Sequence, residues 1–142
     1  MTDDASDADA AAVAALRDAW IAAVAGRDVG ALGDLLEEDY EVWAHGAPAL
    51  RGPAAAAGAM GVALERYAIE QTFEPLETVI AGAWAFERGV ERMRLTPRNG
   101  GPTQDFAQRA LLIMHRGADG RWHYARGMTN GLPAAEAPAT VG

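Results

Sequence analysis

Few side chains in this sequence can exchange protons near neutral pH, and its histidines are the first candidates. The chain of 142 residues has three histidines, no cysteine and no lysine, and its only serine, Ser6, lies in an acidic N-terminal stretch. These absences exclude thiol nucleophiles, Schiff-base lysines and P-loop nucleotide sites, and argue against a Ser-His-Asp hydrolase. Acid–base chemistry would therefore fall to histidine, tyrosine or a carboxylate.

Each histidine has a catalytic and a structural interpretation. His45 falls at the end of a predicted strand, where it can serve as a base or simply face solvent. His115 follows an apolar run and is expected at the exposed end of its strand. In the last predicted strand His123 and Tyr124 point to opposite faces. We favour an inward His123, because its small neighbours leave room for a ligand, and the opposite register stays open.

Carboxylates and arginines alternate along another predicted strand. Its two faces carry Glu87 with Glu91, and Arg88 with Arg92 and Arg94. In one interpretation they form a solvated or dimer-facing outer surface, with ion pairs that contribute ~0.2–1 kcal/mol each. In the other, Glu87 or Glu91 lies inside the fold beside Arg109 or Arg126. Burial would then raise the pKa of that carboxyl, which could act as a general acid or base.

Hydrophobic periodicity predicts the elements that must position these residues. It indicates a helix over 8–25, a short helix capped by Asp28 and a third helix that begins at Pro53. Strands are predicted at about 40–45, 69–80, 83–96, 104–116 and 121–129. We expect one α+β domain over 8–132, with three helices packed on a curved antiparallel sheet. An acidic leader, 1–7, and a tail, 133–142, are expected to be disordered.

Charge and composition limit the kinds of partner and cofactor that this protein is expected to bind. The net charge is -8 and the arginines are scattered among acids, which argues against nucleic acid. No apolar run approaches the ~18 residues of a membrane span, and no signal peptide is evident, so a cytoplasmic protein is expected. The histidines lack metal-ligand spacing, and we expect neither a metal nor another cofactor.

Segments at both ends of the domain carry a family resemblance. Residues 26–43 and 119–130, together with the stretch 84–101 and the order of the elements, resemble the SnoaL-like/DUF4440 branch of the NTF2-like superfamily. That superfamily also holds ketosteroid isomerases, polyketide cyclases and dehydratases. The resemblance covers about residues 10–131 and implies a cone-shaped fold around a pocket. It also implies a homodimer formed through the outer face of the sheet.

The resemblance also predicts which residues form the site. The pocket wall in this fold comes from the first helix, the first strand, the third helix and alternate residues of the long strands. The expected substrate-binding residues are Trp20, Tyr40, Trp43, Met60, Tyr67 and Arg126, and the catalytic candidates are His45, His123, Glu87 and Glu91. The tyrosine and two acids of ketosteroid isomerases would fall on Trp20, on Ala44 or His45, and near Ala110, so none of the three is matched.

Two functions are compatible with these residues. The first is a small cofactor-independent enzyme that performs isomerisation, cyclisation or dehydration on a small hydrophobic carbonyl compound held in an aromatic pocket. The second is a non-catalytic module for ligand binding or dimerisation. We favour the enzyme, because spare histidines and an aromatic lining suit proton transfer on an apolar compound.

Overall fold

A computed structural model describes the backbone of residues 2–133 and the side chains from Ser6 onward. Of the predicted tail at 133–142, residues 134–142 lie outside the described residues. The elements are α1 (Thr2–Ala25), α2 (Val29–Asp34), β1 (Leu36–Trp43), β2 (Leu50–Arg51), α3 (Pro53–Arg66), β3 (Tyr67–Ala81), β4 (Trp84–Pro97), β5 (Gln104–Arg116) and β6 (Trp122–Gly131). The predicted α+β class with three helices is confirmed.

The helices begin and end where local chemistry favours it. The carboxylate of Asp28 accepts a hydrogen bond of 3.0 Å from the N–H of Ala31 and caps α2. Pro53 opens α3 directly after Gly52, whose φ of +86° suits glycine. α1 starts at Thr2, so residues 2–7 continue the helix and do not form a separate leader in the structure. Nothing in this Ala- and Asp-rich stretch breaks a helix, and acidic residues suit a helix N-terminus.

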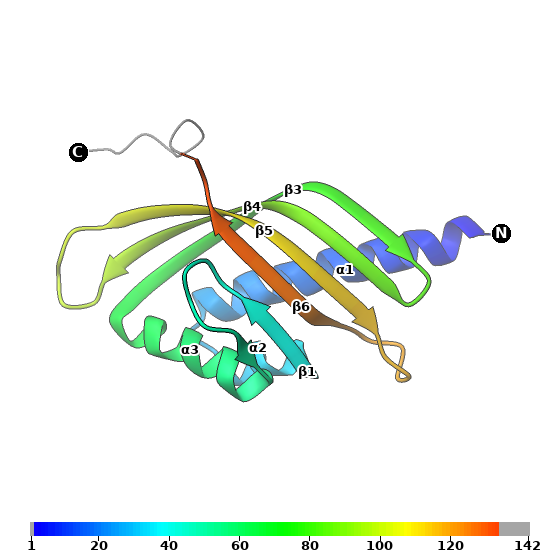
Figure 1. The fold of residues 1–142 in the computed structure, drawn as a ribbon, viewed down its shortest axis with the longest axis horizontal. Coiled ribbons are helices and arrows are strands. Elements are labelled where there is room, and N and C mark those ends of the chain that lie inside the picture. Colours follow the sequence, from blue (N-terminus) through cyan, green and yellow to red (C-terminus); the bar gives the residue numbers. More distant parts are fainter. Residues whose placement is uncertain (1, 134–142) are drawn as a thin grey trace.

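One six-stranded sheet runs in the order β2-β1-β6-β5-β4-β3. β3 to β6 form the predicted antiparallel meander, and β1 joins it by pairing in parallel with β6. The sheet curves around α1, while α2 and α3 close one end (Figure 1). The two-residue strand β2, which pairs with β1, is not among the predicted strands because so short an edge strand has no periodicity.

The bend of the sheet depends on Gly89. A Cβ atom there would lie 2.4 Å from the carbonyl oxygen of Glu74 and 2.6 Å from the ring of Phe73, so no side chain fits. The pairing of β3 with β4 shifts by one residue at the same level, between Pro75 and Glu77. A glycine beside such a bulge lets a long strand fold over on itself. The space enclosed by the sheet follows from this curvature.

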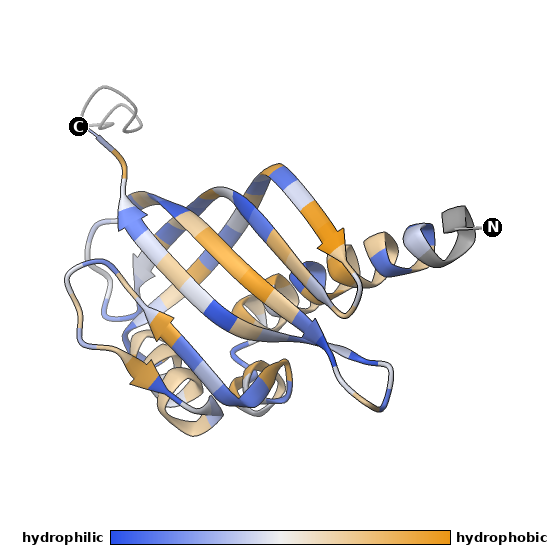
Figure 2. Ribbon diagram, turned by 45° about the vertical axis from the view of Figure 1, so that its right-hand side comes forward, coloured by the Kyte–Doolittle hydropathy of each residue, from blue (hydrophilic) through white to orange (hydrophobic). Residues whose placement is uncertain are grey.

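The helices pack on the concave face of the sheet. Val13 and Leu16 of α1 contact one core cluster that includes Tyr124, while Val24 joins Leu32 of α2 and Leu64 of α3 in a second. The hydrophobic stretch of β5 lies in the middle of the sheet (Figure 2). Within residues 2–133, no helix is long and apolar enough to cross a membrane.

The arginines of β4 lie on the convex face of the sheet. Ion pairs join Arg88 to Glu77 at 2.8 Å and Arg94 to Asp105 at 3.0 Å, with partly exposed side chains on both sides of each pair. Arg92 lies 3.7 Å from Glu74 on the same face. The outer-surface interpretation is therefore correct for the arginines, and the alternation of β4 directs Glu87 and Glu91 inward.

Candidate active site

A cavity of about 290 Å³ lies between α1, α3, β1 and the concave face of the sheet. Its wall is mostly apolar, with a few polar groups contributed by six different strands or helices. The lining residues are Arg17, Trp20, Ile21, Tyr40, Val42, Ala44, Leu50, Ala56, Ala59, Met60, Ala63, Gln71, Phe73, Glu91, Met93, Gln108, Leu112, Tyr124 and Thr129. An apolar pocket with a few convergent polar groups is typical of a small-molecule site.

Glu91 is the carboxylate that faces this cavity. It lies on β4 directly opposite Gln108 of β5, whose Nε2 donates a hydrogen bond of 2.7 Å to Glu91 Oε2. Burial raises the pKa of Glu91, and the hydrogen bond from Gln108 opposes that shift. A carboxyl that titrates closer to neutrality can both take up and return a proton.

Two tyrosines present phenol groups to the same cavity. Burial and then the charge of Glu91 raise the pKa of Tyr40 to about 12. Burial, with a smaller effect of Glu87, likewise raises the pKa of Tyr124. Neither hydroxyl is hydrogen-bonded to another side chain or backbone group within residues 6–133, so both are free to donate to a ligand. Two protonated phenols beside a carboxylate suit a carbonyl compound.

Glu87 is buried too, but its oxygens are already occupied. It is 1% exposed, and Arg17 of α1 donates to both carboxylate oxygens, from Nε at 2.9 Å and from Nη2 at 2.6 Å. Thr78 Oγ1 adds a hydrogen bond of 2.6 Å. These bonds raise the pKa of Arg17, whose guanidinium also lies 5.7 Å from the ring centroid of Phe73. Arg17 lines the cavity and Glu87 does not, so the pair holds α1 against the sheet.

The partner predicted for these acids was wrong. Arg126 lies on the convex face, where its Nη1 donates to the backbone oxygens of Asp39 and Ala125. Arg109 sits at an outer-face position of β5 beside Arg88 and Leu111. The cation beside the buried acid comes from Arg17 of α1, which a comparison of strands alone does not reveal.

The histidines do not line the cavity. His45 is exposed and lies near the rim: its backbone N–H donates to Thr129 Oγ1, and its Nδ1 accepts from the N–H of Gly131. His123 faces the convex side, directly opposite His115 across the β5–β6 pair. The favoured inward orientation of His123 is therefore wrong. Trp122 and Tyr124 occupy the concave side, because burying their large apolar surface is more favourable than burying an imidazole.

A bulge in β6 explains why the alternation could not be followed from the sequence. Ile113 pairs with Arg126, whereas its neighbour Met114 pairs with Tyr124, so one residue of β6 is extra. Beyond the bulge Gly127 faces inward, and a Cβ atom there would lie 3.1 Å from the hydroxyl of Tyr40. Tyr124, Gly127 and Thr129 thus lie on one wall, although the spacing from Tyr124 to Gly127 is odd.

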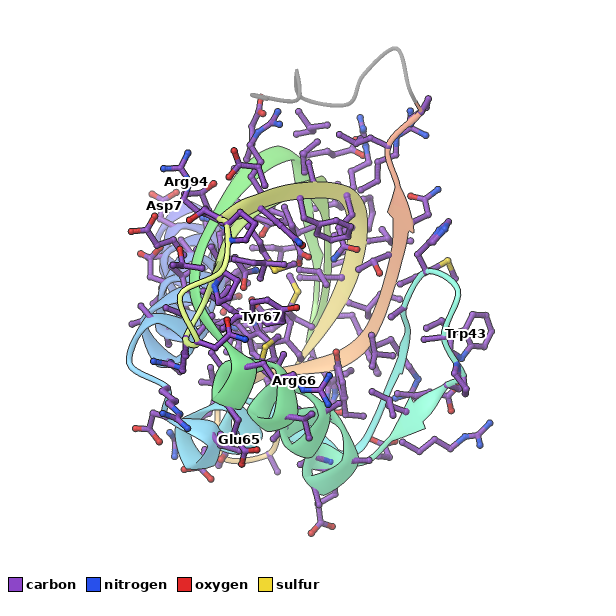
Figure 3. The ribbon with its side chains drawn as sticks, turned by 90° about the vertical axis from the view of Figure 1, so that its left-hand side faces the viewer. Asp7, Trp43, Glu65, Arg66, Tyr67 and Arg94 are labelled. Carbon is purple, nitrogen blue, oxygen red and sulfur yellow. The ribbon has the colours of Figure 1, made fainter. Side chains whose placement is uncertain are left out.

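Some of the residues predicted to bind the substrate line the cavity and others do not. Trp20, Tyr40 and Met60 line the cavity as expected. Trp43 is 54% exposed and its indole N–H donates to Glu41, so it lies on the outside of β1. Figure 3 looks along the inside of the curved sheet and shows Trp43 pointing away from it, with Tyr67 near the end of α3. Tyr67 packs with the second core cluster and is not a lining residue.

Several polar lining residues escaped the sequence analysis. Arg17, Gln71 and Gln108 have ordinary surface character in the sequence, and only the register of the curved strands turns the two glutamines inward. Tyr124 was expected to face inward only in the alternative register of the last strand, in which His123 faces outward. Gln71, Gln108 and Tyr124 share one signal, an inward position on a strand that already carries apolar residues, whereas Arg17 lies on α1. No group of three or more metal-ligating side chains occurs in the described part of the chain.

Similar structures support the fold. A conserved protein from Planctomyces limnophilus is 26% identical, with a TM-score of 0.82 over 89% of this chain and 99% of the other. A ketosteroid isomerase-like protein from Erwinia carotovora atroseptica is 24% identical, with a TM-score of 0.76 over 87% and 95%. A Novosphingobium aromaticivorans protein provisionally named a scytalone dehydratase is 15% identical, with a TM-score of 0.83 over 94% and 89%. No curated protein matches the chain.

The family comparison covers most of the domain. The SnoaL-like domain matches residues 18–125, from the middle of α1 to β6. That span includes Tyr40, Glu91 and Tyr124, whereas Arg17 lies one position before its start. The match, the six-stranded curved sheet and the NTF2-like neighbours agree with the expected resemblance. This chain belongs to the SnoaL-like domain family.

Proposed function

We propose that this protein is a cofactor-independent enzyme that moves a proton on a small apolar carbonyl compound. The observation that carries the proposal is the placement of Glu91, an acid of raised pKa, in one apolar cavity with the phenols of Tyr40 and Tyr124. The wider family includes isomerases and dehydratases, and the ketosteroid isomerase-like neighbour shares the fold.

In the proposed reaction the ionised Glu91 takes a proton from the carbon next to the carbonyl. The electron pair of the broken C–H bond moves toward the carbonyl oxygen, and the O–H groups of Tyr40 and Tyr124 stabilise the resulting negative charge. Isomerisation follows when Glu91 returns the proton to a different carbon. Dehydration follows when the protonated Glu91 instead gives it to a departing hydroxyl group, which leaves as water.

The pKa values of these groups fit their roles over a wide pH range. A general base must be ionised, so kcat/KM should rise with pH through the pKa of Glu91, which burial places above the usual ~4.3. The phenols must stay protonated, and Tyr40 loses its proton only at a pH of about 12. The expected profile is therefore an acidic limb followed by a long plateau.

The test is a screen of enolisable ketones and β-hydroxy ketones of one or two rings, followed by kinetics on any substrate found. Glu91→Gln keeps the shape and the hydrogen bond to Gln108 but removes the base, and we expect turnover to fall by ~10²–10⁴. Glu74→Gln is the matched control, because Glu74 lies on the convex face paired with Arg92. Equal turnover in Glu91→Gln and the wild type would contradict the proposal.

The alternative remains a non-catalytic binding module. One observation favours it: by resemblance, the two acids of ketosteroid isomerases would fall on Ala44 or His45 and near Ala110, and none of these residues is an acid. This alternative predicts that ligands bind in the cavity, that none is turned over, and that Glu91→Gln changes only their affinity.

A further inference from the structure

The guanidinium of Arg17 has one nitrogen that no other residue uses. Its Nε and Nη2 donate to Glu87 at 2.9 and 2.6 Å, which leaves the hydrogens of Nη1. Nη1 makes no hydrogen bond within residues 6–133, and it is not buried, since the one buried and unpartnered side-chain nitrogen or oxygen there belongs to Gln71. The side chain of Arg17 is 19% exposed, against 2% for that of Glu87. A ligand can therefore reach Arg17 but not Glu87.

The geometry of the ion pair turns this nitrogen toward the cavity. In a planar guanidinium Nε and Nη2 share one edge, and the hydrogens of Nη1 point away from that edge. Glu87 is not a lining residue, whereas Arg17 and Phe73, whose ring centroid lies 5.7 Å from the guanidinium carbon, both line the cavity. The donors of Nη1 thus face a mostly apolar space, where a cationic donor is unfavourable unless an acceptor binds to it.

Arg17 lies close to the proposed reaction centre. It precedes Trp20 by three positions on α1, so the two side chains are neighbours on one face of the helix. The ring of Trp20 makes an edge contact with Tyr124, with centroids 5.9 Å apart. Glu91 lies four residues beyond Glu87 on β4, at most about 13 Å along the strand. A compound of one or two rings whose carbonyl lies at the phenols therefore reaches Arg17 with a second polar group.

A carboxylate is the group that fits Arg17 best. Hydrogen bonds from a guanidinium to a carboxylate are charge-assisted and about twice as strong as those between neutral groups. Glu87 balances part of the charge of Arg17, but it lies at the opposite edge of the guanidinium. An anion at Nη1 is therefore nearer to the positive charge than to the negative one, and the attraction exceeds the repulsion.

We propose that Arg17 is a specificity-determining residue that binds a carboxylate of the substrate through Nη1. This inference rests on the proposed function, and it adds one carboxylate, remote from the carbonyl, to the apolar carbonyl compound. Glu87 then positions the guanidinium as well as holding α1 against the sheet, because its two hydrogen bonds fix the direction of Nη1. The cavity volume of about 290 Å³ lies at the small end of ligand pockets, which favours one or two rings.

The experiment compares two ketones of the same shape that differ in charge, 1-tetralone-6-carboxylate and 1-tetralone-6-carboxamide. Calorimetry at pH 7 gives the Kd of each for the full chain and its variants. Arg17→Met/Glu87→Leu removes the guanidinium without leaving an unpaired buried charge, and Arg88→Met, which breaks an exposed pair on the convex face, is the control. We expect the wild type and Arg88→Met to bind the carboxylate about 10- to 100-fold more tightly than the carboxamide, and the double variant to bind both equally.

A third variant gives a result that a purely structural role of Arg17 would not produce. Glu87→Gln keeps the shape of the side chain and an oxygen that accepts from Arg17, but it removes the opposing negative charge. The preference for the carboxylate over the carboxamide should therefore increase about 3- to 10-fold. If Arg17 only held α1 against the sheet, that preference would not change.

Equal binding of the two ketones by the wild type would overturn the proposal, as would no binding of either. A preference that persists in the double variant, or that does not increase in Glu87→Gln, would overturn it too. If the double variant does not fold, Glu87→Gln alone decides. Binding is measured without turnover, so the role of Arg17 can fail while Glu91-dependent catalysis stands, and the reverse holds as well.

Discussion

The buried ion pair between Arg17 and Glu87 allows a quantitative prediction about stability. Arg17→Met removes two charge-assisted hydrogen bonds and leaves the carboxylate of Glu87, whose side chain is 2% exposed, with Thr78 as its remaining donor. Breaking a buried pair by removing one partner costs about 3–5 kcal/mol. For a domain of this size about 3 °C of melting temperature corresponds to 1 kcal/mol, so Tm should fall by roughly 9–15 °C.

Removing both charges should restore most of that loss. The double variant Arg17→Met/Glu87→Leu leaves no orphan charge and fills a similar volume, so its stability should approach that of the wild type. Arg88→Met is the control, because its pair with Glu77 is half-exposed and should contribute within about 1 kcal/mol. Urea unfolding at pH 7 gives the free energies for this double-mutant cycle.

The result that would refute this reasoning is a cost for Arg17→Met as small as that for Arg88→Met. It would mean that water reaches Glu87 and that the pair is not insulated from solvent. A double variant as unstable as Arg17→Met would show instead that the loss comes from packing of the long Arg17 side chain, not from its charge.

Further perturbations separate the base, the histidines and the outer face. Burial raises the pKa of Glu91 in the folded state, so the protonated carboxyl stabilises the folded protein. This stabilisation is fully present below the unfolded pKa of ~4.3 and is lost as the pH rises through the folded pKa. Glu91→Gln should therefore raise Tm at pH 8, with a gain that shrinks toward pH 4; thermal melts showing no gain at pH 8 would contradict this. His45→Gln and His123→Gln should leave turnover within about twofold, because neither ring lines the cavity, and a loss of ~10² or more would return the acid–base role to histidine. We also propose that the convex face, with exposed Trp43, Leu111 and Met128, forms a homodimer; light scattering should give a dimer for the wild type and a monomer for Met128→Glu, and a monomeric wild type would disprove it.

Much of the fold could be predicted from the sequence, because periodicity and caps are local signals. Asp28 and Pro53 start their helices as expected, and long alternating runs separated by glycine-containing turns become the meander. The pairing of β1 with β6 is parallel and distant in sequence, and the sequence contains no local sign of it. The family resemblance supplied the closed shape that local signals lacked.

The site was harder to predict because it depends on which face of each strand points inward. The alternation of β4 already placed Glu87 and Glu91 on the same face of the strand. What the sequence did not show was whether that face points into the fold or toward solvent. In β6 the bulge beside Ala125 breaks the alternation, so no count along the strand places Tyr124 and Gly127 on one wall. Arg17 reaches Glu87 across seventy residues of sequence, and such a contact appears only in three dimensions.

The most direct test of the central claim is proton exchange at the carbon beside a carbonyl. In D2O at pH 7, proton NMR follows the loss of the C2 hydrogens of 6-hydroxy-1-tetralone, which reports proton abstraction even when no product forms. The wild type and Glu74→Gln should accelerate the exchange to the same extent, and Glu91→Gln should lose ~10² or more of that acceleration. Exchange that is equally fast in Glu91→Gln, or no acceleration by the wild type, would contradict the assignment of Glu91 as the base.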